Sequence, residues 1–256
     1  MNPVAQTAGP PGAPPAGEAL PLPPPELQSH VFSRAVSSEE FLEAGRLCAE
    51  SLEGALAGQD LATSRFRRIL DFGCGSGRVI RHFAPLFEGR EFYGSDVDAS
   101  VIAWDRANIP GVWFHRNEAE PPLAFDDEYF DYLWSISVFS HLPEQMAINW
   151  LRELHRILRP GGIAIVTVHG PFRFHEDVSL GRIRPDAIDT FERRGFTYVQ
   201  AFADGRLPAW YQNAFMTEAF ARDLFGRRFE ILDYLPRGMM GRQDLLVLRR
   251  SESASR

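Results

Sequence analysis

One stretch of the sequence, residues 69–81, constrains the fold of this chain more than any other. It reads Ile-Leu-Asp-Phe-Gly-Cys-Gly-Ser-Gly-Arg-Val-Ile-Arg: an apolar run, three alternating glycines and then a helical pattern. Glycines let a backbone turn without Cβ clashes and let a flat ligand approach it closely. Open α/β sheets bind their ligands at the carboxyl ends of strands. The stretch therefore predicts a strand, a turn and a helix that together hold a nucleotide-like ligand.

The glycine spacing excludes two common kinds of nucleotide loop. A dinucleotide-binding loop, G-x-G-x-x-G, needs a third glycine at position 78, which is Arg78, or at position 80 in the alternative register, which is Ile80. A phosphate loop of the G-x-x-x-x-G-K-[ST] type needs a lysine, and the sequence contains none. The ligand is therefore not expected to be held through a pyrophosphate or triphosphate.

Apolar runs and helical patterns alternate as far as residue 168, which predicts a right-handed, doubly wound parallel sheet. Helical patterns begin at the capping box of Ser37 and Glu40, after the glycine loop, after Asp98 and at Pro143. Two more helices are predicted, at residues 185–194 and after a cap at Thr217. We expect the helix after the glycine loop to end near Gly89. The predicted strands after the first are residues 91–96, 112–115, 129–136 and 163–168, with two more at 229–234 and 245–248.

Three segments resemble one family in the same order and at similar spacing. Residues 69–77 are similar to motif I of the class I S-adenosylmethionine-dependent methyltransferases, residues 130–142 to their motif IV region, and residues 158–163 to their Leu-Arg-Pro-Gly-Gly passage. The resemblance implies S-adenosylmethionine as cofactor and a mostly parallel, seven-stranded Rossmann-like sheet. It also implies an antiparallel last strand and an insertion between strands five and six.

The acid that ends the predicted second strand is a candidate for binding the cofactor ribose. Asp96 lies about 20 residues past the glycine loop, where nucleotide-binding α/β folds place such a carboxylate. Asp98 precedes a helical pattern and is interpreted as an N-cap, and Arg78 as a residue of the helix surface. For the adenine amino group the resemblance implies Asn117, with Glu118 as the alternative. The implied cofactor-binding residues are Asp71, Gly73, Gly75, Gly77, Asp96, Val97, Asn117 and Ser135.

A histidine beyond the predicted fourth strand is the first candidate for a catalytic base. The resemblance places His141 near the reaction centre, where it removes a proton from the methyl acceptor, orders the loop or contacts the cofactor. His169 and His175 are second choices. Only five residues separate them and no third ligand follows, so we predict no metal site.

Two segments of the sequence differ in composition or pattern from the alternating strands and helices. Residues 1–28 are rich in Pro, Ala and Gly, which predicts a disordered tail. Residues 37–250 are expected to form the methyltransferase domain. Within them, residues 170–216 break the alternation of strands and helices and contain a cluster of aromatic residues. The resemblance assigns this insertion to substrate recognition.

Charge and cysteine content narrow the choice of partners. The net charge of −7 and the pI of about 5.5 argue against a nucleic-acid partner, and no apolar run reaches the length of a membrane span. Two cysteines without metal-ligand spacing favour a reduced, cytoplasmic setting. The resemblance implies in-line methyl transfer to O or N of a small molecule. The alternatives are a cofactor-binding relative without catalysis and an NAD-dependent oxidoreductase.

Overall fold

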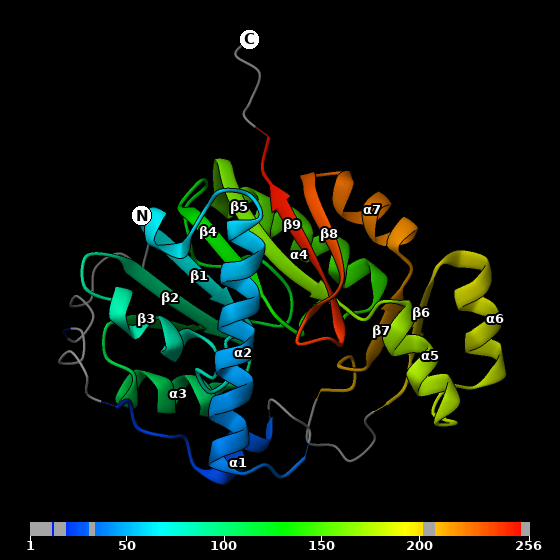
Figure 1. Ribbon diagram of the computed structural model, residues 1–256, viewed down its shortest axis with the longest axis horizontal. Coiled ribbons are helices and arrows are strands. Elements are labelled where there is room, and N and C mark those ends of the chain that lie inside the picture. Colours follow the sequence, from blue (N-terminus) through cyan, green and yellow to red (C-terminus); the bar gives the residue numbers. More distant parts are fainter. Residues whose placement is uncertain (1–11, 13–18, 31–33, 202–207, 252–256) are drawn as a thin grey trace.

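The protein has a seven-stranded sheet with the strand order β3-β2-β1-β4-β5-β9-β8 (Figure 1). The computed structural model describes residues 12, 19–30, 34–201 and 208–251. Neighbouring strands are parallel from β3 to β5, whereas β9 is antiparallel to both β5 and β8. The predicted fold class is therefore confirmed. The strands are β1 (Arg68–Phe72), β2 (Glu91–Asp96), β3 (Val112–Arg116), β4 (Phe130–Ser135), β5 (Leu158–Val168), β8 (Glu230–Met239) and β9 (Gln243–Arg249).

Helices cover both faces of the sheet because successive side chains of each strand point to opposite faces. Ile69 packs with residues of α2 (Ser38–Ala57) and α3 (Ala99–Asn108). The next residue, Leu70, packs with residues of α4 (Glu144–Ile157) and α7 (Glu218–Gly226) on the other face. In Figure 1, α2 crosses the front of the sheet and α4 lies behind it.

Side chains that the sequence marked as caps begin three of these helices. Ser37 accepts a hydrogen bond from the backbone N–H of Glu40, and Thr217 accepts one from that of Phe220. Asp98 accepts one from the backbone N–H of Ser100 at 2.8 Å, which confirms its interpretation as an N-cap. Each cap satisfies a donor that the first helical turn leaves without a partner.

The segment after the glycine loop corrects one prediction. Instead of an α-helix, the chain forms the 3-10 helix η2 (Ile80–Leu86). Pro85 lies inside it, has no N–H, and would clash with the carbonyl four residues earlier in an α-helix. Backbone hydrogen bonds run to the carbonyl three residues earlier instead of four. One example is the bond from the N–H of Phe87 to the carbonyl of Ala84.

The insertion between β5 and β8 forms its own small unit at one side of the sheet (Figure 1). Its strands β6 (Phe196–Val199) and β7 (Asn213–Met216) pair antiparallel, and the predicted helix at 185–194 is present as α6 (Pro185–Arg194). Helix α5 (Pro171–Ser179) was not predicted. A separate core joins the helices to the strand pair through Phe174, Ile183, Phe191 and Phe215.

Part of the predicted tail is folded. Residues 1–11 and 13–18 lie outside the described residues, but the end of the tail contains α1 (Pro25–His30). The Ser76 hydroxyl donates to the carbonyl of Leu27 at 3.2 Å, and the Arg81 guanidinium donates to that of Pro21 at 3.1 Å. Residues 21–27 are therefore tied to the glycine loop and the segment after it, which the proline-rich composition did not indicate. No helix in the described residues is long and apolar enough to cross a membrane.

Candidate cofactor and acceptor site

A cavity of about 530 Å³ lies at the carboxyl ends of β1, β2 and β4. Six of the eight predicted cofactor residues line it, and the other two, Gly77 and Ser135, do not. The predicted catalytic base, His141, does not line it either. Trp210 and Tyr211, which belong to the aromatic cluster of the predicted insertion, line it too, and so does Trp150 of α4, for which the sequence held no signal. The six are Asp71, Gly73, Gly75, Asp96, Val97 and Asn117.

The three glycines of the loop have left-handed backbones but different surroundings. Gly73, Gly75 and Gly77 have φ values of 81°, 51° and 66°, which side-chain-bearing residues rarely adopt. A Cβ on Gly77 would lie 2.3 Å from Cδ1 of Ile109, and one on Gly73 would lie 2.3 Å from Cγ2 of Val138. Gly77 is therefore required by packing behind the loop, whereas Gly75 faces the cavity.

Asp96 connects the end of β2 to the glycine loop. Its Oδ2 accepts a hydrogen bond from the backbone N–H of Gly75 at 2.9 Å, and its Oδ1 accepts one from that of Asp98 at 2.9 Å. Burial raises the pKa of Asp96, and these two hydrogen bonds oppose that shift. Each oxygen keeps a second lone pair, so the carboxylate can still accept hydrogen bonds from a diol in the cavity.

Asp71 and Arg78 place a carboxyl group and a guanidinium group at the glycine loop, and both line the cavity. Asp71 is 2% exposed, and burial raises its pKa to about 8, although the Trp134 indole and the positive charge of Arg78 lower it in part. Oδ2 of Asp71 has no hydrogen-bond partner within the described residues. Arg78 is half-buried and donates to the Cys48 thiol at 3.3 Å. The prediction that Arg78 lies on a helix surface is therefore wrong, since α2 covers it.

Asn117 and Ser135 are both buried but differ in position. The Nδ2 of Asn117 donates to the carbonyl of Glu118 at 2.8 Å, and its Oδ1 has no partner within the described part of the chain. Asn117 therefore presents an acceptor at the cavity wall. Ser135 lies at the end of β4 and is fully buried, outside the cavity lining.

His141 does not line the cavity but packs against Tyr211, which does. Its imidazole stacks on the ring of Tyr211, with 4.3 Å between the centroids, and its Nδ1 lies 2.9 Å from the carbonyl oxygen of Gln212. A carbonyl oxygen only accepts, so Nδ1 carries the proton and Nε2 the lone pair. Burial lowers the pKa of His141 to about 4, so the ring is neutral at pH 7. His169 is also buried, 5.3 Å from His141 between ring centroids, whereas His175 is exposed on α5.

Comparisons with known proteins identify the family. A family model described as a methyltransferase domain matches residues 69–162. The chloroplastic tocopherol O-methyltransferase of Arabidopsis thaliana is 30% identical over 195 residues, 71% of this chain and 52% of that protein. The malonyl-acyl-carrier-protein O-methyltransferase of Enterobacter lignolyticus is 27% identical over 154 residues, 57% of this chain and 55% of that protein. The matched region thus spans about half of each relative.

Solved structures share the fold at low sequence identity. A magnesium protoporphyrin IX methyltransferase of Synechocystis, crystallised with bound S-adenosylhomocysteine, has a TM-score of 0.57 and 16% identity and covers 88% of this chain and 94% of its own. A methyltransferase of Methanosarcina mazei has a TM-score of 0.56 and 19% identity, covering 73% of this chain and 93% of its own. The chain belongs to the class I S-adenosylmethionine-dependent methyltransferase superfamily. This membership argues against the oxidoreductase alternative.

The cavity suits S-adenosylmethionine, the cofactor of the superfamily. S-adenosylmethionine presents an ammonium and an adenine amino group as donors, and the cavity offers buried acceptors without partners on Asp71 and Asn117. S-adenosylmethionine also carries a carboxylate. Among the cationic side chains that line the cavity, that of Arg78 is nearest to the glycine loop in sequence. The donor and acceptor set of the protein therefore fits the group.

One residue at the wall of this cavity is held in an unusual conformation. Ser137 follows β4 and has a φ of 58°, which a residue with a Cβ adopts only where its surroundings fix it. Its N–H donates to the hydroxyl of Thr167 at 2.9 Å, and its Oγ accepts from Nε2 of Gln243 at 2.8 Å. Contacts from β5 and β9 thus fix this serine at the cavity wall.

Proposed function

We propose that this chain transfers a methyl group from S-adenosylmethionine to an oxygen or nitrogen of a small-molecule acceptor. The carrying observation is that a buried carboxyl group and a guanidinium group both line the cavity at the glycine loop. Asp71 has a buried carboxylate oxygen without a partner, and Arg78 is held beside it under α2. An amino-acid group carries one ammonium and one carboxylate, so the pair is complementary to the methionine part of the cofactor. The relatives named as O-methyltransferases support the same reaction class.

The residues of the insertion suit an acceptor with an apolar or aromatic body. Trp210 and Tyr211 precede β7 and line the same cavity as the residues of the glycine loop. When bound, the cofactor supplies an electrophilic methyl group on a positively charged sulfur. The task of the protein is to hold the acceptor atom about 3 Å from that carbon, in line with the bond that breaks. Aromatic rings that fix the plane of the acceptor serve this purpose.

Turnover and cofactor binding test this function separately. We expect saturable binding of S-adenosylhomocysteine in isothermal titration calorimetry, and transfer of a labelled methyl group to at least one acceptor in a panel of phenols, carboxylic acids and amines. Binding without transfer to any acceptor would favour the non-catalytic alternative. Absence of binding would reject both.

We propose that His141 accepts the proton of the acceptor. The neutral ring with its lone pair on Nε2 supports this role, which requires the Tyr211 ring to move aside. His141→Asn keeps a donor for the carbonyl of Gln212 but removes Nε2. We expect kcat to fall by about 10²- to 10⁴-fold, with the S-adenosylhomocysteine affinity within about threefold of wild type. His175→Asn, at an exposed position, is the control. Retention of more than about a tenth of kcat in His141→Asn would instead assign His141 to ordering the loop.

Arg78 is expected to bind the carboxylate of the cofactor. Arg78→Gln should weaken binding of S-adenosylhomocysteine by about 10- to 100-fold, the effect of losing a charge-assisted hydrogen bond. Binding of 5′-methylthioadenosine, which lacks the amino-acid group, should change by less than about twofold. Calorimetry with both ligands measures the difference. Equal losses for the two ligands would show that Arg78 acts on the shape of the loop.

A further inference from the structure

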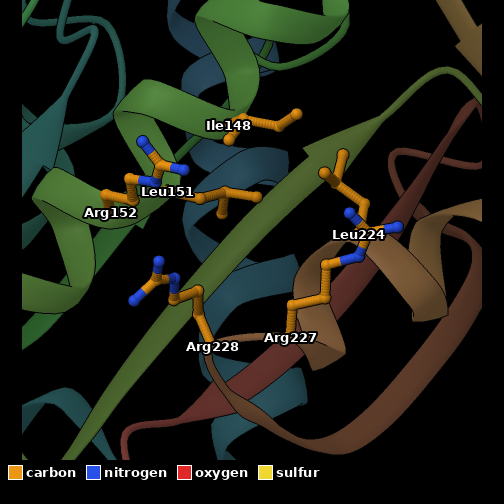
Figure 2. A pocket seen from close by; sticks show the side chains of 6 residues that line it. All are labelled: Ile148, Leu151, Arg152, Leu224, Arg227 and Arg228. Carbon is orange, nitrogen blue, oxygen red and sulfur yellow. The ribbon is translucent and has the colours of Figure 1, made fainter.

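A second, smaller cavity lies between α4 and α7, on the face of the sheet opposite α2 (Figures 1 and 2). Its volume is about 160 Å³. Leu151 and Leu224 are buried and Ile148 is half-buried, which gives the cavity an apolar floor. Figure 2 shows arginines around this floor, extending from α4 and from the segment that follows α7. They are Arg152, Arg227 and Arg228, all exposed.

Two of these arginines differ from every other arginine that the structure describes. Each of the others makes at least one ion pair or hydrogen bond through its guanidinium group, whereas within the described residues Arg152 and Arg228 make none. Arg227 pairs with Asp223, but both side chains are more than 60% exposed, so the pair is weak. The cavity therefore brings together two guanidinium groups whose hydrogen-bonding capacity the described protein does not use.

This arrangement is unusual in a chain with a net charge of −7. The positive field extends into the protein beside the cavity, because Arg250 and Arg228 add to burial in lowering the pKa of His155. Like charges that share one cavity repel each other, and a bound anion removes that cost. The planar donor fork of a guanidinium matches carboxylate and phosphate oxygens.

We infer that this cavity binds a small organic oxyanion, a carboxylate or phosphate attached to an apolar body. The anionic group would bind Arg152 and Arg228, and the body would lie against Leu151 and Leu224. The volume of 160 Å³ limits the body to about one six-membered ring, since a cavity of about 150 Å³ holds one benzene molecule.

The cavity is distinct from the cofactor site. The two share no lining residue, although they share one helix: Trp150 lines the cofactor cavity and Leu151 lines this one. Because an aromatic anion could also enter the cofactor cavity, binding has to be measured with that cavity filled.

Calorimetry on the full chain, saturated with S-adenosylhomocysteine, tests the inference with benzoate and phenyl phosphate as probes. We expect at least one to bind with a Kd of about 1 mM or tighter, and the tighter one identifies the oxyanion. Benzyl alcohol, which has the ring without the charge, should bind at least about tenfold more weakly. If the chain does not bind S-adenosylhomocysteine, the same titration is run without it, and the arginine variants locate the site.

The variant Arg152→Gln, Arg228→Gln is expected to lose at least about tenfold in affinity for the better probe. Arg184→Gln changes an arginine that is 85% exposed at the residue before α6, and should stay within about twofold of wild type. All these positions are exposed, so melting temperatures should be unchanged within about 2 °C. Absence of saturable binding, or equal binding by the double variant and wild type, would overturn the inference.

Discussion

Exchanging Asp71 for asparagine is expected to weaken binding of S-adenosylhomocysteine by about 10- to 100-fold, because the ammonium of the ligand loses its buried carboxylate partner. Asparagine has nearly the same shape, so the glycine loop should keep its conformation. Calorimetry at pH 8 measures the loss. Asp60→Asn, on an exposed turn after α2, is the control for a change of one charge and should bind as wild type does. Equal affinity in Asp71→Asn and wild type would remove Asp71 from the cofactor site.

The same variant is expected to change how stability depends on pH. The folded pKa of Asp71 is raised to about 8 from 3.8, so between pH 4 and pH 8 the unfolded state binds fewer protons than the folded state. Wild type therefore loses stability through this group as the pH rises across that window. The asparagine variant does not lose this stability. Its free energy of unfolding should therefore increase relative to that of wild type as the pH rises from 4 to 8. Urea unfolding at several pH values tests the sign, and a constant difference would contradict a raised pKa.

Gly77→Ala is expected to cost about 3 kcal/mol in the free energy of unfolding. Of this, about 1–2 kcal/mol comes from the left-handed backbone of an alanine, and the rest from overpacking against Ile109, whose Cδ1 would lie 2.3 Å from the new Cβ. The melting temperature should fall by about 10 °C. The second substitution Ile109→Val removes that methyl group and should restore part of the loss.

Gly89→Ala is the matched control for Gly77→Ala. Gly89 has a φ of 82°, but no heavy atom lies within 4 Å of a Cβ built on it, so only the backbone cost of about 1–2 kcal/mol is expected. If both variants lose the same stability, Gly77 is required by its φ alone. The fraction of Gly77→Ala that stays folded should bind S-adenosylhomocysteine nearly as wild type does, because Gly77 does not line the cavity. A selective loss of binding would return Gly77 to the cofactor site.

The predictable part of the fold is local. The glycine loop, the end of β2 at Asp96 and the caps at Ser37 and Asp98 depend on residues close together in sequence, and each was placed correctly. The 3-10 helix η2 also has a local cause, Pro85, whose effect was outweighed in the prediction by the apolar periodicity around it. Helix α1 had no such signal, because its position depends on contacts with the glycine loop.

The sequence by itself determined the superfamily and the doubly wound parallel sheet, and it predicted six of the residues that line the cavity, because those follow from periodicity, glycine spacing and the ends of strands. Tertiary structure decided what lies around them. It placed Arg78 under α2 and at the cavity, Gly77 against Ile109 and Tyr211 over His141. It also brought the arginines of α4 and of the segment after α7 together, although more than 70 residues separate them in the chain. Such contacts join positions that share no local pattern, and only the packing of whole elements creates them.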